Sequence, residues 1–243
     1  MTCASYTDPR LAACYDPLNP ADPADAYYLA LAGDRPKTIL DMGCGTGRLA
    51  VALAERGHRV IGADPADGML RVARTRPGTE HVRWIQSTAA ELSLDERFDL
   101  IIMTGNVFQV FLEDDEVRAT LRNLRRHLAP SGRLAFGTRN PLVEDWRTWI
   151  PDLTRERIEA PGIGPVDIHH DIAAAERDRV SFETHFRFSA DDIVVTTTTL
   201  RCMSRDELAA FLNEAGFSDV TWYGDWDRSP ITPQSPEIIV IAT

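Results

Sequence analysis

Lysine is almost absent from this sequence. Lys37 is the only lysine among 26 basic residues, and it directly precedes an apolar run that is typical of a buried strand. A Schiff-base lysine, a phosphate-loop lysine or a kinase-type lysine would have to use this one position. The sequence therefore disfavours all three chemistries.

Cysteines and long apolar runs are scarce as well. The four cysteines, Cys3, Cys14, Cys44 and Cys202, form no C-x-x-C pair and have no matching histidine pair. Neither a zinc site nor a disulfide framework is predicted, and a reducing compartment fits. No apolar run reaches 18 residues, and the N-terminal MTCASYTDPR has no basic start followed by an apolar segment. We expect a cytoplasmic protein that makes no contact with a membrane.

Basic charge is the third shortage. The 26 basic residues are outnumbered by 37 acidic ones, and the formal net charge is -11. Such a surface repels phosphate backbones, so nucleic acid is not an expected partner. The hydrophobic fraction of 44% is that of an ordinary soluble chain, and 243 residues suit a single domain. A monomer and a homodimer both stay open.

The first half of the chain alternates short apolar runs with amphipathic segments. This alternation is typical of a parallel sheet with helices on both faces. The expected strands are 37–42, 58–63, 82–86, 98–103 and 132–138, and the expected helices lie near 46–56, 66–75 and 114–128. The pattern predicts an α/β protein with a Rossmann-like, doubly wound sheet.

The pattern changes after Pro141, where tryptophans, prolines and glycines punctuate a stretch without a clear period. The segments that follow predict three antiparallel strands, at 166–176, 179–190 and 192–203. Ser204 and Glu207 form a capping-box signal for a helix over 205–217. Two last strands, at 219–226 and 237–243, complete a seven-stranded, mostly parallel sheet. We expect one domain in four parts: a helical N-terminal cover (1–36), a core (37–140), inserted antiparallel strands (141–203), and a final helix and strand pair (204–243).

The strongest local signal is ILDMGCGTGRLA at 39–50, an apolar strand that runs through an acidic residue into a glycine-rich turn and a helix. Glycines at 43, 45 and 47 allow a sharp turn and a close approach of the backbone to a ligand. A dinucleotide fingerprint would need glycine at position 48, where Arg48 stands. The spacing therefore favours a smaller adenosyl ligand over a pyrophosphate.

This pattern resembles motif I of the class I S-adenosylmethionine-dependent methyltransferases. The resemblance implies S-adenosylmethionine as the cofactor and S-adenosylhomocysteine as the product. It implies that Asp41 receives the amino group of the cofactor and that Asp64 takes both ribose hydroxyls. The expected cofactor-binding residues are Asp41, Gly43, Cys44, Gly45, Thr46, Gly47, Asp64, Pro65, Met69, Thr88, Ala89 and Thr104.

One position departs from the family pattern. The family often carries an acid after the third strand that reaches the adenine amino group, and this chain has Thr88 at the matching place. Adenine recognition falls either to Thr88 or to the backbone near Ala89. Met69 is expected to lie over the adenine, with core packing as its alternative role.

The segment MTGNVFQVF after the fourth strand matches the region where the family lines the gap between cofactor and acceptor. It lacks the N/D-P-P-Y/F sequence of base methyltransferases and the paired glutamates of protein-arginine methyltransferases, so a small-molecule acceptor is expected. The candidate substrate-binding residues are Asn106, Gln109, Arg139, Asn140, Trp146 and Trp149. Together with Trp222, Tyr223 and Trp226 they suggest an aromatic-lined pocket for a flat acceptor such as an indole or a phenol.

Methyl transfer from a sulfonium is an in-line displacement that requires positioning and the exclusion of water, and no metal. A nitrogen, oxygen or carbon acceptor stays open. Where a general base is needed, the candidates are His169, His170 and His185, and neighbouring His169 and His170 must face opposite sides of a strand. Tyr15, ahead of Tyr27 and Tyr28 on an expected N-terminal helix, resembles the cover that the family places over the cofactor. Tyr15 is therefore a further catalytic candidate, which would orient the acceptor or cap the sulfonium.

Two rival functions remain at this stage. A non-catalytic sensor or partner subunit would keep the same cofactor loop, so the loop does not separate it from an enzyme. A nicotinamide oxidoreductase is disfavoured by Arg48.

Overall fold

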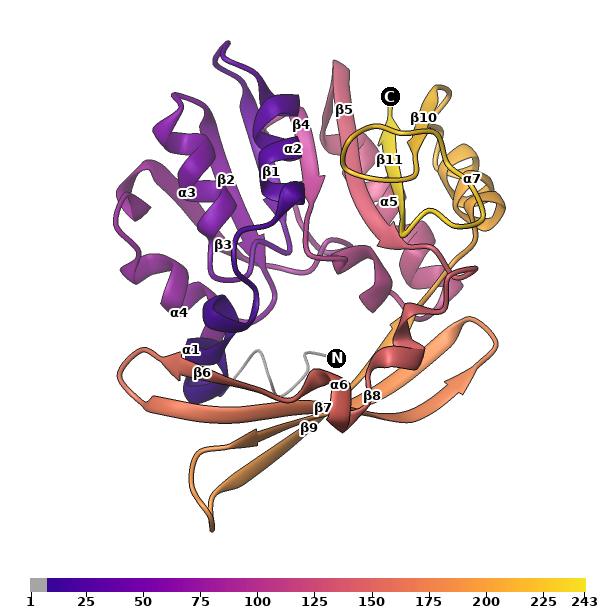
Figure 1. The fold of residues 1–243 in the computed structure, drawn as a ribbon. Coiled ribbons are helices and arrows are strands. Elements are labelled where there is room, and N and C mark those ends of the chain that lie inside the picture. The colour runs from indigo at the N-terminus through magenta and orange to yellow at the C-terminus, as the bar shows by residue number, and fades with distance from the viewer. Residues whose placement is uncertain (1–7) are drawn as a thin grey trace.

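The computed structural model describes residues 8–243, so Cys3 and most of the N-terminal stretch discussed above lie outside the described residues. Two sheets make up the molecule (Figure 1). The large sheet has seven strands, in the spatial order β3 (Val82–Gln86), β2 (Arg59–Asp64), β1 (Thr38–Met42), β4 (Phe98–Met103), β5 (Leu128–Arg139), β11 (Glu237–Ala242) and β10 (Val220–Tyr223).

Five neighbouring strands of the large sheet are parallel; β11 runs antiparallel to β5, and the edge strand β10 runs antiparallel to β11. The chain builds β1, β2 and β3 outward and then returns to the other side of β1 with β4. This reversal between β1 and β4 is the point at which open α/β sheets bind ligands, beyond the carboxyl ends of the strands. The prediction of a doubly wound, seven-stranded sheet is confirmed.

Helices cover both faces of the large sheet. The helices α2 (Pro23–Ala32) and α3 (Arg48–Glu55) pack with β1 and β2 in one apolar cluster. The helices α5 (Asp114–His127) and α7 (Arg205–Glu214) belong to the cluster on the opposite face. Acidic side chains occupy the first turn of α5 and basic ones its last turn, which matches the helix dipole. The predicted capping box of Ser204 and Glu207 starts α7.

The second sheet is antiparallel and has four strands in chain order: β6 (Glu156–Ala160), β7 (Gly164–Glu176), β8 (Arg179–Arg187) and β9 (Ile193–Arg201). Figure 1 shows it across the end of the large sheet where β5 terminates. The predicted trio of strands is thus one strand too few. The missed strand is β6, with the sequence ERIEA, which has only two buried positions, Ile158 and Ala160. Its alternation of apolar and polar residues is too short to predict a strand from the sequence.

Helix α1 (Pro9–Leu18) joins the two layers. On one side Leu11 and Cys14 pack with buried residues of β6 and β7. On the other, Ala12 packs with Met69 of α4 (Asp67–Thr75). The N-terminal cover therefore consists of two helices, and α1 is the one that reaches the second sheet.

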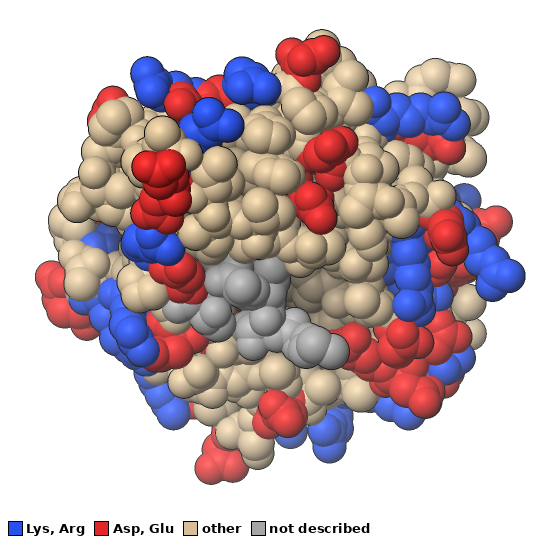
Figure 2. Space-filling view, turned by 90° about the horizontal axis from the view of Figure 1, so that it is seen from below, with Lys and Arg blue, Asp and Glu red and all other residues tan. Residues whose placement is uncertain are grey.

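Charge is mixed over the face that includes the second sheet. On the coloured part of Figure 2, blue side chains are scattered among red ones and form no continuous basic area. Among residues 8–243 no helix combines the length and the apolar character needed to cross a bilayer. Within the same range no three histidine, cysteine, aspartate or glutamate side chains gather as a metal site would require.

Candidate active site

The glycine loop closes tightly between β1 and α3. Gly43, Gly45 and Gly47 all have positive φ, at 77°, 53° and 76°. A Cβ on Gly43 would lie 2.6 Å from Val107, and one on Gly47 would lie 2.3 Å from Trp84. Side chains at Gly43 and Gly47 are excluded by both conformation and space, so a ligand can approach the backbone of the loop closely.

Asp41 lies below this loop, near the end of β1. Its side chain is 1% exposed, and neither carboxylate oxygen has a hydrogen-bond partner. Burial, together with the negative charges of Asp64 and Asp25, raises the pKa of Asp41 to about 7. A buried acceptor without a donor is costly. Asp41 is therefore suited to an amino group brought by a ligand.

Asp64 ends β2 and faces the same loop. One carboxylate oxygen accepts from Gly45 N at 2.9 Å, and the other accepts from Ala66 N at 2.8 Å. Burial raises the pKa of Asp64, while these two N–H groups lower it. Each oxygen keeps acceptor capacity for a hydroxyl donor. Asp64 thus holds the turn before α4 and can still receive two hydroxyls.

The expected adenine side is more fully engaged within the protein. Met69 is 2% exposed and packs on Ala12 and Ala66, so core packing accounts for its position. The Thr88 hydroxyl donates to a Glu91 carboxylate oxygen at 2.9 Å and accepts from Glu91 N at 3.3 Å. Thr88 therefore caps its own turn.

Two more residues flank this side. Pro65 is exposed, and its carbonyl accepts from Gln86 Nε2 at 3.1 Å. Ala89 is 3% exposed, and its carbonyl accepts from Asn123 Nδ2 at 2.8 Å, which commits that carbonyl to α5. The roles of Thr88, Ala89, Met69 and Pro65 toward a ligand stay predictions.

Tyr15 lies over the glycine loop from α1. Its ring is 3.8 Å from the position of a Cβ on Gly45, and its hydroxyl is 3.6 Å from that of a Cβ on Gly105. Tyr15 thus bridges the loops that follow β1 and β4, the latter containing Thr104. Burial, followed by the negative charge of Asp64, raises the pKa of Tyr15, so the phenol stays protonated at neutral pH.

Polar contacts fix this cover in place. Asp16 of α1 accepts from Thr46 Oγ1 in the glycine loop at 2.5 Å and pairs with Arg76 after α4. Arg48 at the start of α3 donates to the Asn19 carbonyl and forms an ion pair with Asp25 at 3.0 Å. Cys44 is buried and faces Gly62 rather than the cover.

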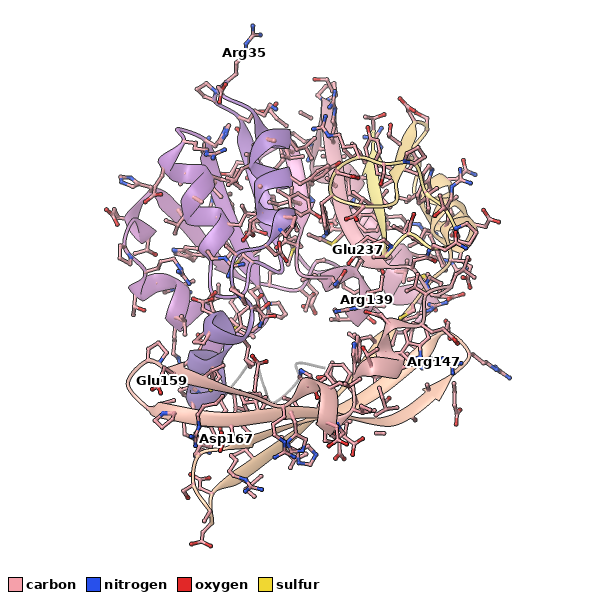
Figure 3. The ribbon with its side chains drawn as sticks, in the orientation of Figure 1. Arg35, Arg139, Arg147, Glu159, Asp167 and Glu237 are labelled. Atoms are coloured by element: carbon pink, nitrogen blue, oxygen red, sulfur yellow. The ribbon has the colours of Figure 1, made fainter. Side chains whose placement is uncertain are left out.

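The acceptor-side residues after β4 and β5 form one connected group. Gln109 is fully buried; its Oε1 accepts from Arg139 Nη1 at 2.9 Å, and its Nε2 donates to Cys202 Sγ at 3.0 Å. Arg139 also donates from Nε to Asp145 at 3.0 Å, and its guanidinium lies 4.9 Å from the centre of the Trp149 ring. Arg139 is therefore held by protein groups at the end of β5 that faces the second sheet (Figure 3).

Asn106 and Asn140 lie on either side of this group. Asn106 precedes the short helix η3 (Val107–Val110) in the left-handed conformation, with φ of 58°. Asn140 is 3% exposed; it donates to the carbonyls of Thr232 and Ser235 and accepts from Leu142 N. Both polar atoms of this amide have partners within the protein, so Asn140 holds the turn after β5, and its contact with a substrate stays a prediction.

The tryptophans do not gather into one pocket as expected. Trp226 packs on Tyr27 and Tyr28 in the core, and Trp222 lies under Arg205 of α7. Trp146 is 8% exposed and packs with Val180 and Cys202. The half-buried Trp149 contacts Phe182 of β8 edge to face, with 4.9 Å between ring centres. The expected aromatic wall is thereby reduced to Trp149 and Phe182.

Of the three candidate histidines, His170 lies on the inner face of the second sheet. It shares strand parity with Val166 and Ile168, which pack against α1. Its Nδ1 lies 3.0 Å from Thr184 Oγ1, and its ring contacts Phe182 edge to face at 5.5 Å. Burial, and then His169, lowers the pKa of His170, which keeps the imidazole neutral.

His169 and His185 occupy the outer face. Their rings stack with 4.5 Å between centres, and His185 pairs with Glu183 at 3.2 Å. They point away from α1 and the glycine loop, so the structure separates them from the site that the sequence assigned to them.

Glu237 is a residue that the sequence analysis passed over. It is the first residue of β11 and is the register partner of Arg139, the last residue of β5. Its Oε2 is buried without a hydrogen-bond partner. Burial raises the pKa of Glu237 to about 7, even though the positive charge of Arg139 acts to lower it. The available signal in the sequence was an acidic residue directly before the apolar run IIVIA, which placed a charge at the end of a buried strand.

Comparisons with known proteins agree with this geometry. Residues 39–132 match the family model of a methyltransferase domain. The cypemycin N-terminal methyltransferase of a Streptomyces species is 34% identical over 105 residues, which are 43% of this chain and 43% of that protein. The chain thus matches less than half the length of this curated relative.

Solved structures resemble nearly the whole chain. The CcbJ methyltransferase from Streptomyces caelestis has a TM-score of 0.76 at 22% identity and covers 98% of this chain and 97% of its own. CalS10, an amino pentose methyltransferase from Micromonospora echinaspora, has a TM-score of 0.67 at 22% identity, with 95% of each chain covered. At these identities the likeness establishes the fold.

Proposed function

We propose that this chain, which belongs to the class I S-adenosylmethionine-dependent methyltransferase family, transfers a methyl group from S-adenosylmethionine to an amine nitrogen of a small molecule. The observation that carries the proposal is the unpaired, buried carboxylate of Asp41 directly below the glycine loop. An amino group on a ligand would satisfy it, and Asp64 offers two acceptor oxygens for a ribose. The residues present therefore fit the family cofactor.

When bound, S-adenosylmethionine supplies an electrophilic methyl group on a sulfonium. The chain's own part is to hold the reactants in line and to exclude water. Gly43, Gly45 and Gly47 let the backbone approach the ligand, and Tyr15 covers the loop from α1. Because its phenol is protonated, Tyr15 presents a ring and a neutral O–H, both compatible with a sulfonium nearby.

The acceptor would occupy the space between the carboxyl end of the large sheet and the inner face of the second sheet. Trp149 and Phe182 offer an angled pair of apolar rings there, and the neutral imidazole of His170 lies beside Phe182. These contacts support a flat or cyclic acceptor. Nitrogen as the nucleophile is supported by the names of two relatives, an N-terminal methyltransferase and an amino pentose methyltransferase.

Calorimetric titration with S-adenosylmethionine and S-adenosylhomocysteine tests the cofactor site. We expect micromolar binding by the wild type and roughly 100-fold weaker binding by Asp64→Ala, because two hydrogen bonds to a buried carboxylate are lost. Asp67→Ala is the control, since Asp67 is a partly exposed residue of α4 that pairs with Arg71. Folded wild-type protein that binds neither ligand would contradict the proposal. Binding without release of S-adenosylhomocysteine in an amine screen would favour the sensor.

A further inference from the structure

Glu237 lies on the acceptor side of the site. Strand order places β11 beyond β4 and β5 from β1, and neighbouring strands are about 4.8 Å apart, so Glu237 is roughly 14 Å from the glycine-loop strand. Figure 3 shows Glu237 and Arg139 together at the edge of the large sheet that faces the second sheet. Glu237 is therefore poorly placed for the cofactor's amino acid end and well placed for an acceptor.

The carboxylate of Glu237 lacks the donor that its burial calls for. Its Oε2 is shielded from solvent and has no hydrogen-bond partner. Arg139 is its register partner, but the guanidinium donates to Asp145 and Gln109 and stacks on Trp149. A buried carboxylate oxygen in this state is costly to the fold unless a ligand supplies the donor.

The charges around Glu237 favour a cationic donor. Arg139 is the basic group that acts on it, whereas Asp145, Asp225 and Asp22 act on it with negative charge. Arg139 is itself paired with Asp145. Arg139 has the largest effect among these charges, but the other three are carboxylates, so a positive charge on the acceptor would be attracted there.

We propose that Glu237 binds the protonated amine of the acceptor and removes one of its protons before methyl transfer. This inference rests on the proposed methyl transfer and adds the charge of the acceptor and the residue that receives it. The N–H bond breaks, and the proton passes to Glu237 Oε2. The freed lone pair forms the N–C bond as the C–S bond breaks, whose electron pair stays on sulfur to leave a neutral thioether and a methylated ammonium. The proton on Glu237 then leaves to solvent.

Matched acceptors test the chemical class. Wild-type enzyme with S-adenosylmethionine is offered tryptamine against tryptophol, cyclohexylamine against cyclohexanol, and glucosamine against glucose, and S-adenosylhomocysteine release is measured. At least one amine is expected to be methylated in preference to its alcohol. Methylation of alcohols with equal or better efficiency, or of no amine at all, overturns the inference.

Two variants test the residue. Glu237→Gln keeps the shape but cannot carry charge or take a proton; we expect kcat/KM for the amine to fall roughly 30-fold or more. The rise in wild-type rate centred near pH 7 should disappear as well. Glu159→Gln is the control, because Glu159 is an exposed residue of β6 on the second sheet, away from Glu237 (Figure 3). Should Glu237→Gln fail to fold, Glu237→Asp, whose carboxylate is one methylene shorter, is expected to raise KM for the amine.

Cofactor titration separates the two proposals. Glu237→Gln is expected to bind S-adenosylmethionine as the wild type does, because Glu237 is remote from the glycine loop. Absence of cofactor binding by the wild type defeats the proposed function. Methyl transfer to an amine by Glu237→Gln at the wild-type rate, with the pH profile unchanged, defeats only the assignment of Glu237.

Discussion

Among single residues, Asp41 combines nearly complete burial with a carboxylate that has no hydrogen-bond donor. It is buried at the end of β1 and has no hydrogen-bond partner on either oxygen. A residue chosen for stability alone would not leave a carboxylate in this condition. Its place below the glycine loop explains the arrangement, since a ligand with an amino group would supply the missing donors.

This condition predicts a pH dependence of stability. Burial raises the pKa of Asp41 from 3.8 to about 7, so between these values the folded protein holds a proton that the unfolded chain has lost. Stability of the ligand-free protein should therefore fall as pH rises from about 4 to about 7. Asp41→Asn should lessen this fall and raise the free energy of unfolding at pH 8 by on the order of 2–4 kcal/mol, while weakening cofactor binding.

Urea unfolding at pH 5 and at pH 8 measures this effect. Asp152→Asn is the control, because Asp152 is exposed on α6 (Pro151–Thr154). If Asp41→Asn loses as much free energy of unfolding between pH 5 and pH 8 as the wild type does, the burial of a charged Asp41 does not cause the fall in stability.

Among the elements, strand β7 sorts two adjacent histidines onto opposite faces. Its pairing with β8 aligns His169 with His185 and His170 with Thr184. The edge of β7 beyond β6 is closed by Thr154, whose hydroxyl bonds both the N–H and the carbonyl of His170. The backbone of His170 is thereby fixed on both sides, which sets the direction of its ring.

The two histidines are therefore predicted to differ in function. His170→Asn should lower kcat/KM for the acceptor roughly tenfold, because a neutral imidazole on the inner face is lost. His169→Asn is the matched control on the outer face and should change kcat/KM little. Steady-state kinetics with an amine that the wild-type enzyme methylates measures kcat/KM for both variants. An equal loss in the two, or a loss only in His169→Asn, would contradict the assignment of the inner face.

At the scale of the whole molecule, α1 connects the cofactor half to the second sheet. Its apolar side packs on β6 and β7, and its Asp16 bonds Thr46 of the glycine loop and Arg76. The glycine loop and the second sheet are therefore joined through one helix.

Loosening this link should weaken cofactor binding without unfolding the protein. Asp16→Ala removes the bonds to Thr46 and Arg76, and we expect about tenfold weaker affinity for S-adenosylhomocysteine by calorimetry, or about 1.4 kcal/mol. Asp192→Ala is the control, because it removes the exposed ion pair with Arg10 at the other end of α1. The binding free energy of S-adenosylhomocysteine should weaken by less than about 1 kcal/mol in this variant. Equal affinities of Asp16→Ala and the wild type would show that α1 does not cover the cofactor site.

Local sequence determined much of this protein. The apolar periods predicted the strands β1 to β4 and the helices α3, α4 and α5 to within a few residues, because each buries a face set by its own side chains. The spacing of Gly43, Gly45 and Gly47 predicted the tight turn that the structure has between β1 and α3, and residues 39–132 match the family model of a methyltransferase domain. The capping box at Ser204 was likewise a local signal.

Tertiary structure alone decided the acceptor side. Asn140, Trp146 and Trp226 follow the same sequence rules as binding residues, yet partners distant in the chain draw them into packing or turn contacts. Glu237 became a candidate only when β11 paired with β5 and placed it opposite Arg139. Strand periods and glycine spacings depend on residues that are close in sequence. Burial and an unpaired charge depend on contacts between segments about a hundred residues apart.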